Sequence, residues 1–187
     1  RPAPGPLRLT AARAALSHDG AEGGPRLALL SNGAEVQVQQ GRIEVEQVDP
    51  HQTRVALRSG SVRLSVPRLL SPRRLSVATA DAEVIVHGTR FEVRKVDGAT
   101  QVSVEEGLVE VRPQGGGRPP AFLRPGERLV VPGLDAYRAE LAGRVAELVR
   151  DVRCDDHAID GYLAVAAPGS DTSAALYLRG SCAARRG

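Results

Sequence analysis

The stretch T-R-V-A-L-R-S-G-S-V-R-L-S-V (residues 53–66) sets the pattern for most of this chain. On each side of Gly60, Val or Leu alternates with polar residues. Such alternation is typical of a β-strand with one face in a core. A central glycine can supply the positive φ of a tight turn or bulge. The stretch therefore predicts strand, glycine turn, strand.

The same alternation extends over residues 27–131, with Gly or Pro roughly every 8 to 12 positions. No helical period of comparable length competes there. We therefore expect a mainly β domain with antiparallel strands, of sandwich or barrel type. The predicted strands cover residues 34–39, 42–48, 53–57, 61–66, 83–86, 90–96, 101–105 and 108–111.

After Pro132 and Gly133 the pattern becomes helical. One helix is predicted over residues 134–152, a second over 156–166, and a third from Ser170 or Asp171 to the last glycine. Residues 134–187 are thus expected to be an α-helical segment of two to three helices. Its apolar face is a candidate partner surface, because it lacks a complete partner in the sequence. We assign to this surface Tyr137, Leu141 and Leu148.

Composition narrows the function classes. Of the 25 basic residues, 24 are Arg and only Lys95 is Lys, the net charge is +3, and aromatic residues make up 3%. A nucleic-acid binder usually has stacking aromatics beside its basic face, so we expect no nucleic-acid partner. No run of about 18 apolar residues occurs. Cys154 and Cys182 either form one bridge in an oxidising compartment or remain free.

The chain contains no Met and begins R-P-A-P-G-P. We expect residues 1–26 to be a Pro/Gly-rich linker and lead-in, in a processed protein or a fragment. A membrane attachment is then expected through a segment absent from these residues.

Residues 100–113 align with residues 53–66, and Gly107 then corresponds to Gly60. Either the chain contains an internal repeat, or two β-hairpins simply look alike. Arg58 aligns with Glu105, and Arg63 aligns with Glu110. One hypothesis is that the two segments are neighbours, with these opposite charges on adjoining strands.

The alternative is one basic surface that meets an anionic partner. Its candidate residues are Arg58, Arg63, Arg68, Arg73 and Arg74.

In V-I-V-H-G-T-R-F-E-V (84–93), Gly88 and Thr89 interrupt an alternating run. A glycine in a strand usually marks a bulge or a close backbone approach. Thr89 can bond locally to the backbone, and Phe91 is expected to return to the core. His87 has no second ligand at metal spacing. The interruption therefore predicts a bend and no reactive site.

Four segments in order carry a family resemblance: L-S-V-A-T (75–79), V-x-V-x-G-T-x-F-x-V (84–93), V-x-V-x-x-G-x-V-x-V (102–111) and L-x-P-G-E-x-L (123–129). Together with the glycine pattern before them, they resemble the FecR domain over residues 27–131. The resemblance implies a jelly-roll-like antiparallel β-sandwich and a non-catalytic periplasmic module. In the best-known members this domain relays a signal from an outer-membrane receptor to a sigma factor. The family-motif residues are Gly60, Gly88, Thr89, Phe91, Gly107, Val109, Gly126 and Glu127.

The helical segment departs from the iron-uptake members, in which a mixed α/β region follows. Residues 173–187 are instead similar to the first helix of a tetratricopeptide-type repeat.

The sequence gives little support to the hypothesis that this protein is an enzyme. Cys154, Asp156, His157 and Asp160 have the residue types of a metal site, but zinc ligands normally come in two pairs. A cap and helix start, with Asp155 or Asp156 as the cap, explains the segment better. No Ser lies in a G-x-S-x-G turn. We predict no catalytic, cofactor-binding or metal-binding residues.

The sequence thus predicts an extracytoplasmic sensing or regulatory module that acts through protein–protein contacts in the bacterial envelope. The alternative is an envelope scaffold or glycan-binding protein, in which the β domain is an adaptor for helical repeats.

Overall fold

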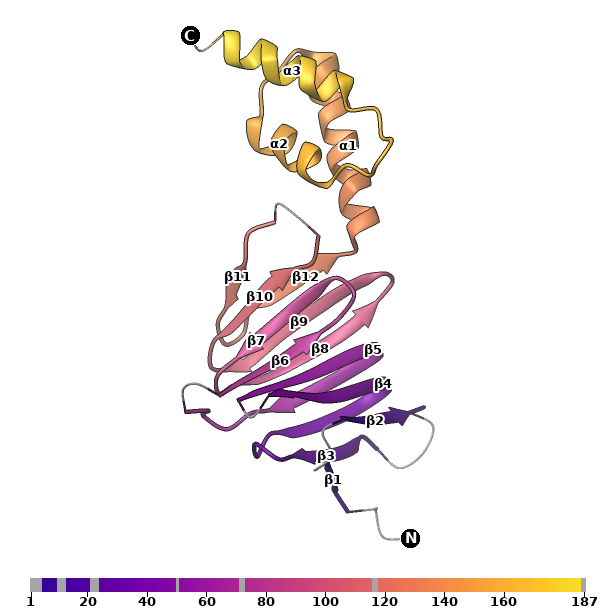
Figure 1. The fold of residues 1–187 in the computed structure, drawn as a ribbon, viewed down its shortest axis with the longest axis vertical. Helices are drawn as coiled ribbons and strands as arrows, with labels where there is room; N and C mark the ends of the chain where they lie inside the picture. Colours follow the sequence, from indigo (N-terminus) through magenta and orange to yellow (C-terminus); the bar gives the residue numbers. More distant parts are fainter. Residues whose placement is uncertain are drawn as a thin grey trace. The chain divides into compact units, whose positions relative to one another are not determined.

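The computed structural model describes residues 5–9, 13–20, 24–49, 51–70, 73–115 and 118–185. The chain divides into a β unit (Arg1–Pro113 and Pro119–Val131) and a helical unit (Gln114–Arg118 and Pro132–Gly187) (Figure 1). The prediction of a mainly β fold followed by C-terminal helices is confirmed.

The strands are β1 (Leu7–Leu9), β2 (Arg13–His18), β3 (Arg26–Leu30), β4 (Glu35–Asp49), β5 (Gln52–Ser65), β6 (Arg74–Ala78), β7 (Ala82–Val86), β8 (Arg90–Val96), β9 (Ala99–Glu106), β10 (Val109–Pro113), β11 (Ala121–Leu123) and β12 (Arg128–Pro132). The helices are α1 (Leu134–Asp151), α2 (Asp156–Val165) and α3 (Ser173–Ala184). Strands β1 and β2 lie within residues 1–26, so the lead-in was wrongly predicted to be a linker throughout. Residues 1–4, 10–12 and 21–23 lie outside the described part.

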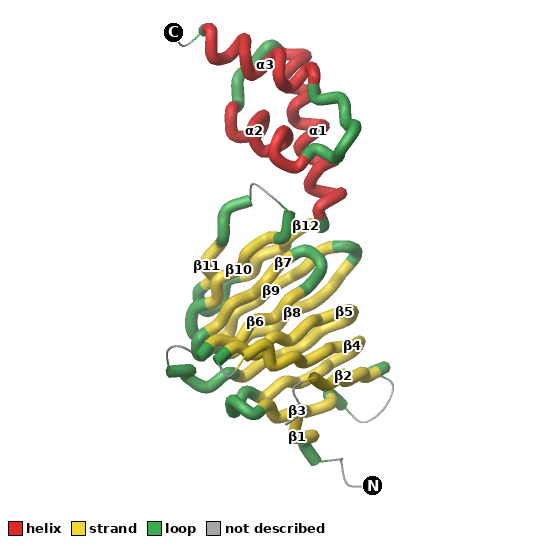
Figure 2. Tube along the Cα trace, viewed as in Figure 1, coloured by secondary structure: helices red, strands yellow, loops and turns green. Residues whose placement is uncertain are grey.

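The long hairpin β4–β5 is shared by two layers of strands (Figure 2). Layer I has the order β2-β4-β5-β6-β7-β10-β11, through the second half of β4 and the first half of β5. Layer II has the order β1-β3-β4-β5-β8-β9-β12, through the other two halves. Buried side chains of both layers form one core cluster, for example Val77 and Val84 from layer I with Phe91 and Val102 from layer II. The β unit is therefore a sandwich.

Most strand pairs are antiparallel, as predicted, but β1–β3 and β5–β6 are parallel. A pattern of alternating residues fixes which side chains are buried and leaves the strand direction open. The jelly-roll plan stays an expectation drawn from the family resemblance.

Gly41 and Gly60 form the corner at which the hairpin passes from layer I to layer II. They are register partners with positive φ of 102° and 81°. A Cβ on Gly41 would lie 1.9 Å from the carbonyl oxygen of Ser59, and one on Gly60 would lie 1.9 Å from that of Gln40. Only glycine fits this approach. The predicted turn at Gly60 is thus a bend inside one continuous strand.

A second corner joins Gly88 and Gly107. The chain crosses from β7 in layer I to β8 in layer II at Gly88, and returns from β9 to β10 at Gly107. A Cβ on Gly107 would lie 2.6 Å from the carbonyl oxygen of Gly88, and one on Gly88 would lie 2.8 Å from the Cα of Arg68. The two crossings therefore pack against each other. In the proposed repeat, residues 53–66 pass from layer I to layer II at Gly60, and residues 100–113 pass from layer II to layer I at Gly107.

The helical unit has its own small core. Side chains from all three helices meet in it, among them Val145, Ile159 and Leu178. A disulfide between Cys154 and Cys182 joins the segment before α2 to α3, with 5.7 Å between the Cα atoms. Within the described residues, no helix is both long and apolar enough to cross a membrane.

The corner predicts that Gly60→Ala lowers the free energy of unfolding by more than about 4 kcal/mol, because the two backbones must separate. Gly98 provides a matched control, since its φ is also positive (75°) but nothing lies within 4 Å of its Cβ position. Gly98→Ala should cost about 1 kcal/mol, the price of the backbone conformation alone. Urea unfolding followed by far-ultraviolet circular dichroism measures both. Equal losses in the two variants would contradict the corner's role.

Candidate functional site

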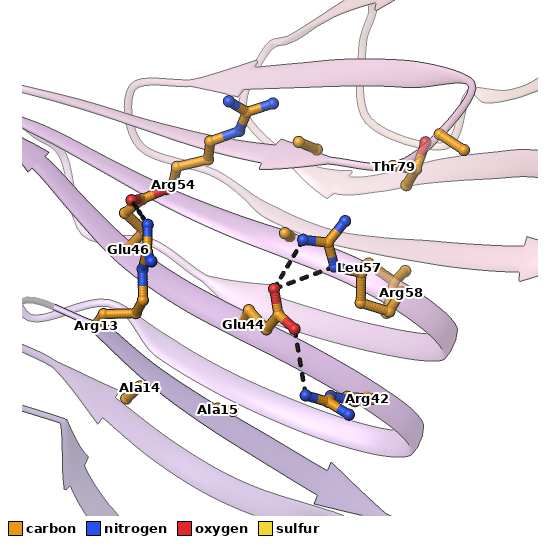
Figure 3. Close-up of a pocket in the computed structure, with 13 residues that line it drawn as sticks. Arg13, Ala14, Ala15, Arg42, Glu44, Glu46, Arg54, Leu57, Arg58 and Thr79 are labelled. Carbon is orange, nitrogen blue, oxygen red and sulfur yellow. Dashed lines mark hydrogen bonds and ion pairs between the residues drawn. The ribbon is translucent and has the colours of Figure 1, made fainter.

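A groove of about 670 Å³ lies on the outer face of layer I (Figure 3). We call it the layer I groove; it is lined by Arg13, Ala14, Ala15, Arg42, Glu44, Glu46, Arg54, Ala56, Leu57, Arg58, Ala78, Thr79 and Ala80. The strand register places Ala15, Glu44, Ala56 and Ala78 in one row across four strands. The hollow follows from the sequence, because three of these four outward side chains are alanines.

Two carboxylates hold three of the groove's four arginines. Glu44 accepts hydrogen bonds from Nη2 of Arg58 at 2.7 Å and from Nη2 of Arg42 at 3.3 Å. The hydrogen bond from Arg58 lowers the pKa of Glu44, against the effect of partial desolvation. Arg13 pairs with Glu46, whose hydrogen bond raises the pKa of Arg13. These pairs are exposed, so each contributes little to stability.

Arg54 differs from the other three arginines. Its register partners are Glu46 on β4 and Ser76 on β6, and its side chain is exposed. Among the residues that the structure describes, it makes no hydrogen bond or ion pair, and Figure 3 shows its guanidinium apart from the bonded groups. The groove is thus suited to binding anionic groups, with one guanidinium available.

A second polar cluster lies at the turns between β6 and β7 and between β8 and β9. Asp81 accepts hydrogen bonds from Nζ of Lys95 at 2.5 Å and from Oγ1 of Thr100 at 2.8 Å, both on Oδ2. The hydroxyls of Thr79 and Thr100 lie 2.7 Å apart. Asp81 and Thr100 are buried, and the cluster joins a turn of layer I to a hairpin of layer II. It binds the two layers together and offers no access to a substrate.

The only lysine of an arginine-rich chain lies in this cluster. An ammonium is compact and can donate to the one carboxylate oxygen that it shares with Thr100, whereas a guanidinium is a wide planar fork. The role of Lys95 could not be predicted from the sequence, because its carboxylate partner Asp81 lies 14 positions away.

The five arginines of the predicted basic surface do not come together. Alternation along β5 turns Arg58 to the outer face of layer I and Arg63, beyond the bend, to the outer face of layer II. Arg73 and Arg74 are exposed at the start of β6, and the backbone of Arg68 packs against Gly88. One continuous basic surface from these five residues is therefore not formed.

The hypothesis of adjoining, oppositely charged strands is also wrong in its placement. Strand β8 lies between β5 and β9, and Arg58 pairs with Glu44. Arg63 nevertheless reaches Glu105 across β8 at 3.3 Å, and it also lies 3.6 Å from Glu92 on β8 itself. Opposite charges of the two segments therefore do meet, through one of the two aligned arginines and one of the two aligned glutamates.

The family-motif residues lie at corners and in the core. Phe91 and Val109 are fully buried, as expected of core positions. Thr89 is buried too, but its hydroxyl has no hydrogen-bond partner among the described residues, so the predicted local bond is not made. Its backbone instead pairs with Val66, through N–H donation in both directions at 3.1 and 2.8 Å. The Gly-Thr interruption is a structural bend, as predicted.

Gly126 and Glu127 form the turn before β12. The backbone N–H of Gly126 donates to the carbonyl of Val104, and that of Val104 donates to the carbonyl of Glu127. The carboxylate of Glu127 accepts from the backbone N–H of Arg124 at 2.7 Å. The motif thus fixes this turn against β9.

The predicted apolar partner surface of the helices is largely covered within the helical unit. Leu141 and Leu148 are buried, and the guanidinium of Arg118 stacks over the ring of Tyr137 at 4.7 Å. Exposed apolar side chains lie instead on α3, where Leu176 is 53% exposed and Tyr177 is 77% exposed. A single helical period shows one apolar face and cannot show which neighbours cover it.

In the segment 154–160, Cys154 forms a disulfide and Asp155 is the N-cap of α2. The sulfur of Cys154 is bonded to that of Cys182, so it is not a free thiolate ligand. Asp155 caps α2 by accepting from the backbone N–H of Ala158 at 3.1 Å, which, with the hydrogen bond from Arg144, lowers its pKa. Asp160 pairs with Arg179. In the described ranges, no group of three or more His, Cys, Asp or Glu side chains is placed so that it could hold a metal ion.

A comparison with protein families matches residues 20–110 to the family described as FecR protein, slightly less than half of the chain. The predicted resemblance is confirmed over this range, which contains both glycine corners. It stays a prediction for residues 111–131, and so does the tetratricopeptide resemblance of 173–187, whose last two residues are outside the described part.

Solved structures share the fold. Two crystal structures, each titled a "putative anti-sigma factor" from Parabacteroides distasonis ATCC 8503, are similar to this chain. One is 21% identical with a TM-score of 0.53, over 75% of this chain and 73% of that one. The other is 23% identical with a TM-score of 0.51, over 68% of this chain and 63% of that one. No curated protein matches the chain.

The polar cluster predicts that Asp81→Ala is strongly destabilising, by about 3 kcal/mol, because it leaves the part-buried ammonium of Lys95 and the buried hydroxyl of Thr100 without their carboxylate. Adding Lys95→Met should recover part of that loss, since the unpaired charge is then removed. A thermodynamic double-mutant cycle from urea unfolding measures the coupling. Additive losses would show that the two groups act independently.

Proposed function

We propose that this protein is the extracytoplasmic recognition module of a bacterial envelope regulator, and that it acts through protein contacts on signalling to a sigma factor. The observation that carries the proposal is the FecR match over residues 20–110. The two structures of the same fold have titles that name an anti-sigma factor, which agrees with it. The proposal places the module in the periplasm, with membrane attachment outside these residues.

The disulfide supports an extracytoplasmic site of action. Disulfides persist in oxidising compartments and are rare in the cytosol, where thiols are kept reduced. The Cys154–Cys182 bridge closes a loop of 28 residues around α2 and most of α3, in a unit whose core is small. Such a unit gains most from a covalent link.

The polar groups support a role in binding. Thr79, Asp81 and Thr100 bond to one another or to Lys95 inside the sandwich. The groove on layer I carries guanidinium and carboxylate groups with no activated nucleophile beside them. Such groups are suited to ion pairing with a partner.

The exposed Leu176 and Tyr177 favour a second candidate, an envelope scaffold or glycan-binding protein. In that case α3 would pack against further helices, and the β unit would be an adaptor.

Deletion and restoration of the gene in the native bacterium tests the proposal. We expect a small, coherent set of transcripts to change on deletion and to return on restoration, because a sigma factor controls a defined group of promoters. Transcript sequencing measures the change. An unchanged transcript profile together with an altered envelope would contradict the regulatory function and favour the scaffold.

A further inference from the structure

We propose that the layer I groove binds an acidic segment of a protein partner, and that Arg54 is the residue that captures its carboxylate. The inference rests on the proposed function, since a regulator that acts through protein contacts needs a contact surface. It names that surface and the chemistry of the partner.

Charge balance favours an acidic partner. Four arginines and two glutamates line the groove, so its lining has an excess of positive charge. Arg13, Arg42 and Arg58 already share Glu44 and Glu46. A carboxylate that approaches Arg54 can form two parallel hydrogen bonds with the guanidinium without breaking an existing ion pair.

Ser76 is the neighbour of Arg54 on the adjacent strand of layer I, and its side chain is closed to solvent. It is the register partner of Arg54 on β6 and is 3% exposed. Its hydroxyl is buried and has no hydrogen-bond partner within the described ranges. Since buried polar groups are normally bonded, such a hydroxyl calls for an explanation. Ser76 does not line the groove, so the proposed contact does not depend on its hydroxyl.

The outer face of layer II has no comparable excess. On β5 and β8 the arginines are paired: Arg90 with Glu106, Arg94 with Glu92, and Arg63 with both Glu92 and Glu105. The layer I groove, by contrast, combines an arginine without an ion pair among the described residues with a lining of four arginines and two glutamates.

The shape and lining favour a protein segment over nucleic acid or lipid. No aromatic side chain lines the groove, so bases would find no stacking platform. The alanine floor leaves room for side chains of an extended segment. Strand β2, which among the described strands pairs only with β4, borders the groove.

The test uses a rhodamine-labelled peptide of eight alternating Glu and Ser residues, with a Gln and Ser peptide as the neutral control. Fluorescence anisotropy is measured at low ionic strength, where surface charges are least screened. We expect the Glu peptide to bind more tightly than the Gln peptide. Arg54→Gln should raise its Kd about tenfold, as expected for one charged hydrogen-bonding group.

Arg128→Gln is the matched control. Arg128 is exposed at the start of β12, makes no ion pair among the described residues, and its loss changes the net charge equally. It should leave Kd nearly unchanged. Equal effects of the two substitutions, or equal binding of the two peptides, would overturn the proposal. Tighter Arg54-dependent binding of oligothymidine or of phosphatidylglycerol vesicles would do the same.

Introducing Arg54→Gln into the native gene separates this inference from the proposed function. Loss of the transcript response, with a normal amount of protein, supports the surface. A transcript response that persists in the variant overturns the surface and leaves the regulatory function standing. The absence of any response in the unmodified strain contradicts the function itself.

Discussion

The close approach of Gly41 and Gly60 is the constraint on which the β unit depends. Two strands of one hairpin bend at the same level, with positive φ at both glycines and no room for a Cβ on either. Each strand can then serve both layers: β5 pairs with β6 before the bend and with β8 after it. Without that corner the hairpin would be one flat ribbon, and the two sets of alternating Val and Leu would not face each other across a core.

The remaining architecture follows from keeping those layers together. The corner of Gly88 and Gly107 packs two crossings against each other, and the buried cluster of Asp81, Lys95 and Thr100 ties a turn of one layer to a hairpin of the other. The inward side chains of both layers form the core. Contact with a partner therefore depends on the side chains of the outer faces. There, the arginines of β5 and β8 on layer II are paired, whereas the guanidinium of Arg54 in the layer I groove makes no ion pair among the described residues.

The strand region 27–131, the three helices and the bend at Gly88 could be predicted, because each depends on local periodicity or on glycine. The strands β1 and β2 and the bend of β5 at Gly60 were not predicted. The sequence alone could not identify what depends on contacts between distant residues. The alignment of Arg63 with Glu110 suggested opposite charges meeting, yet the partner of Arg63 is Glu105, since β8 lies between the strands. The bend at Gly60 also puts Arg58 and Arg63 on opposite faces, which a linear pattern cannot reveal. Arg54 was overlooked because its importance comes from lacking a partner.

We propose that this chain works outside the cytoplasm, and the redox state of its two cysteines in the native cell tests that location. Cells would be quenched in acid, their free thiols alkylated with N-ethylmaleimide, and the protein's intact mass measured before and after reduction. The account predicts that neither Cys154 nor Cys182 is alkylated until the protein is reduced, because an oxidising compartment preserves their bond. Alkylation of both cysteines before reduction, in most molecules, would contradict it.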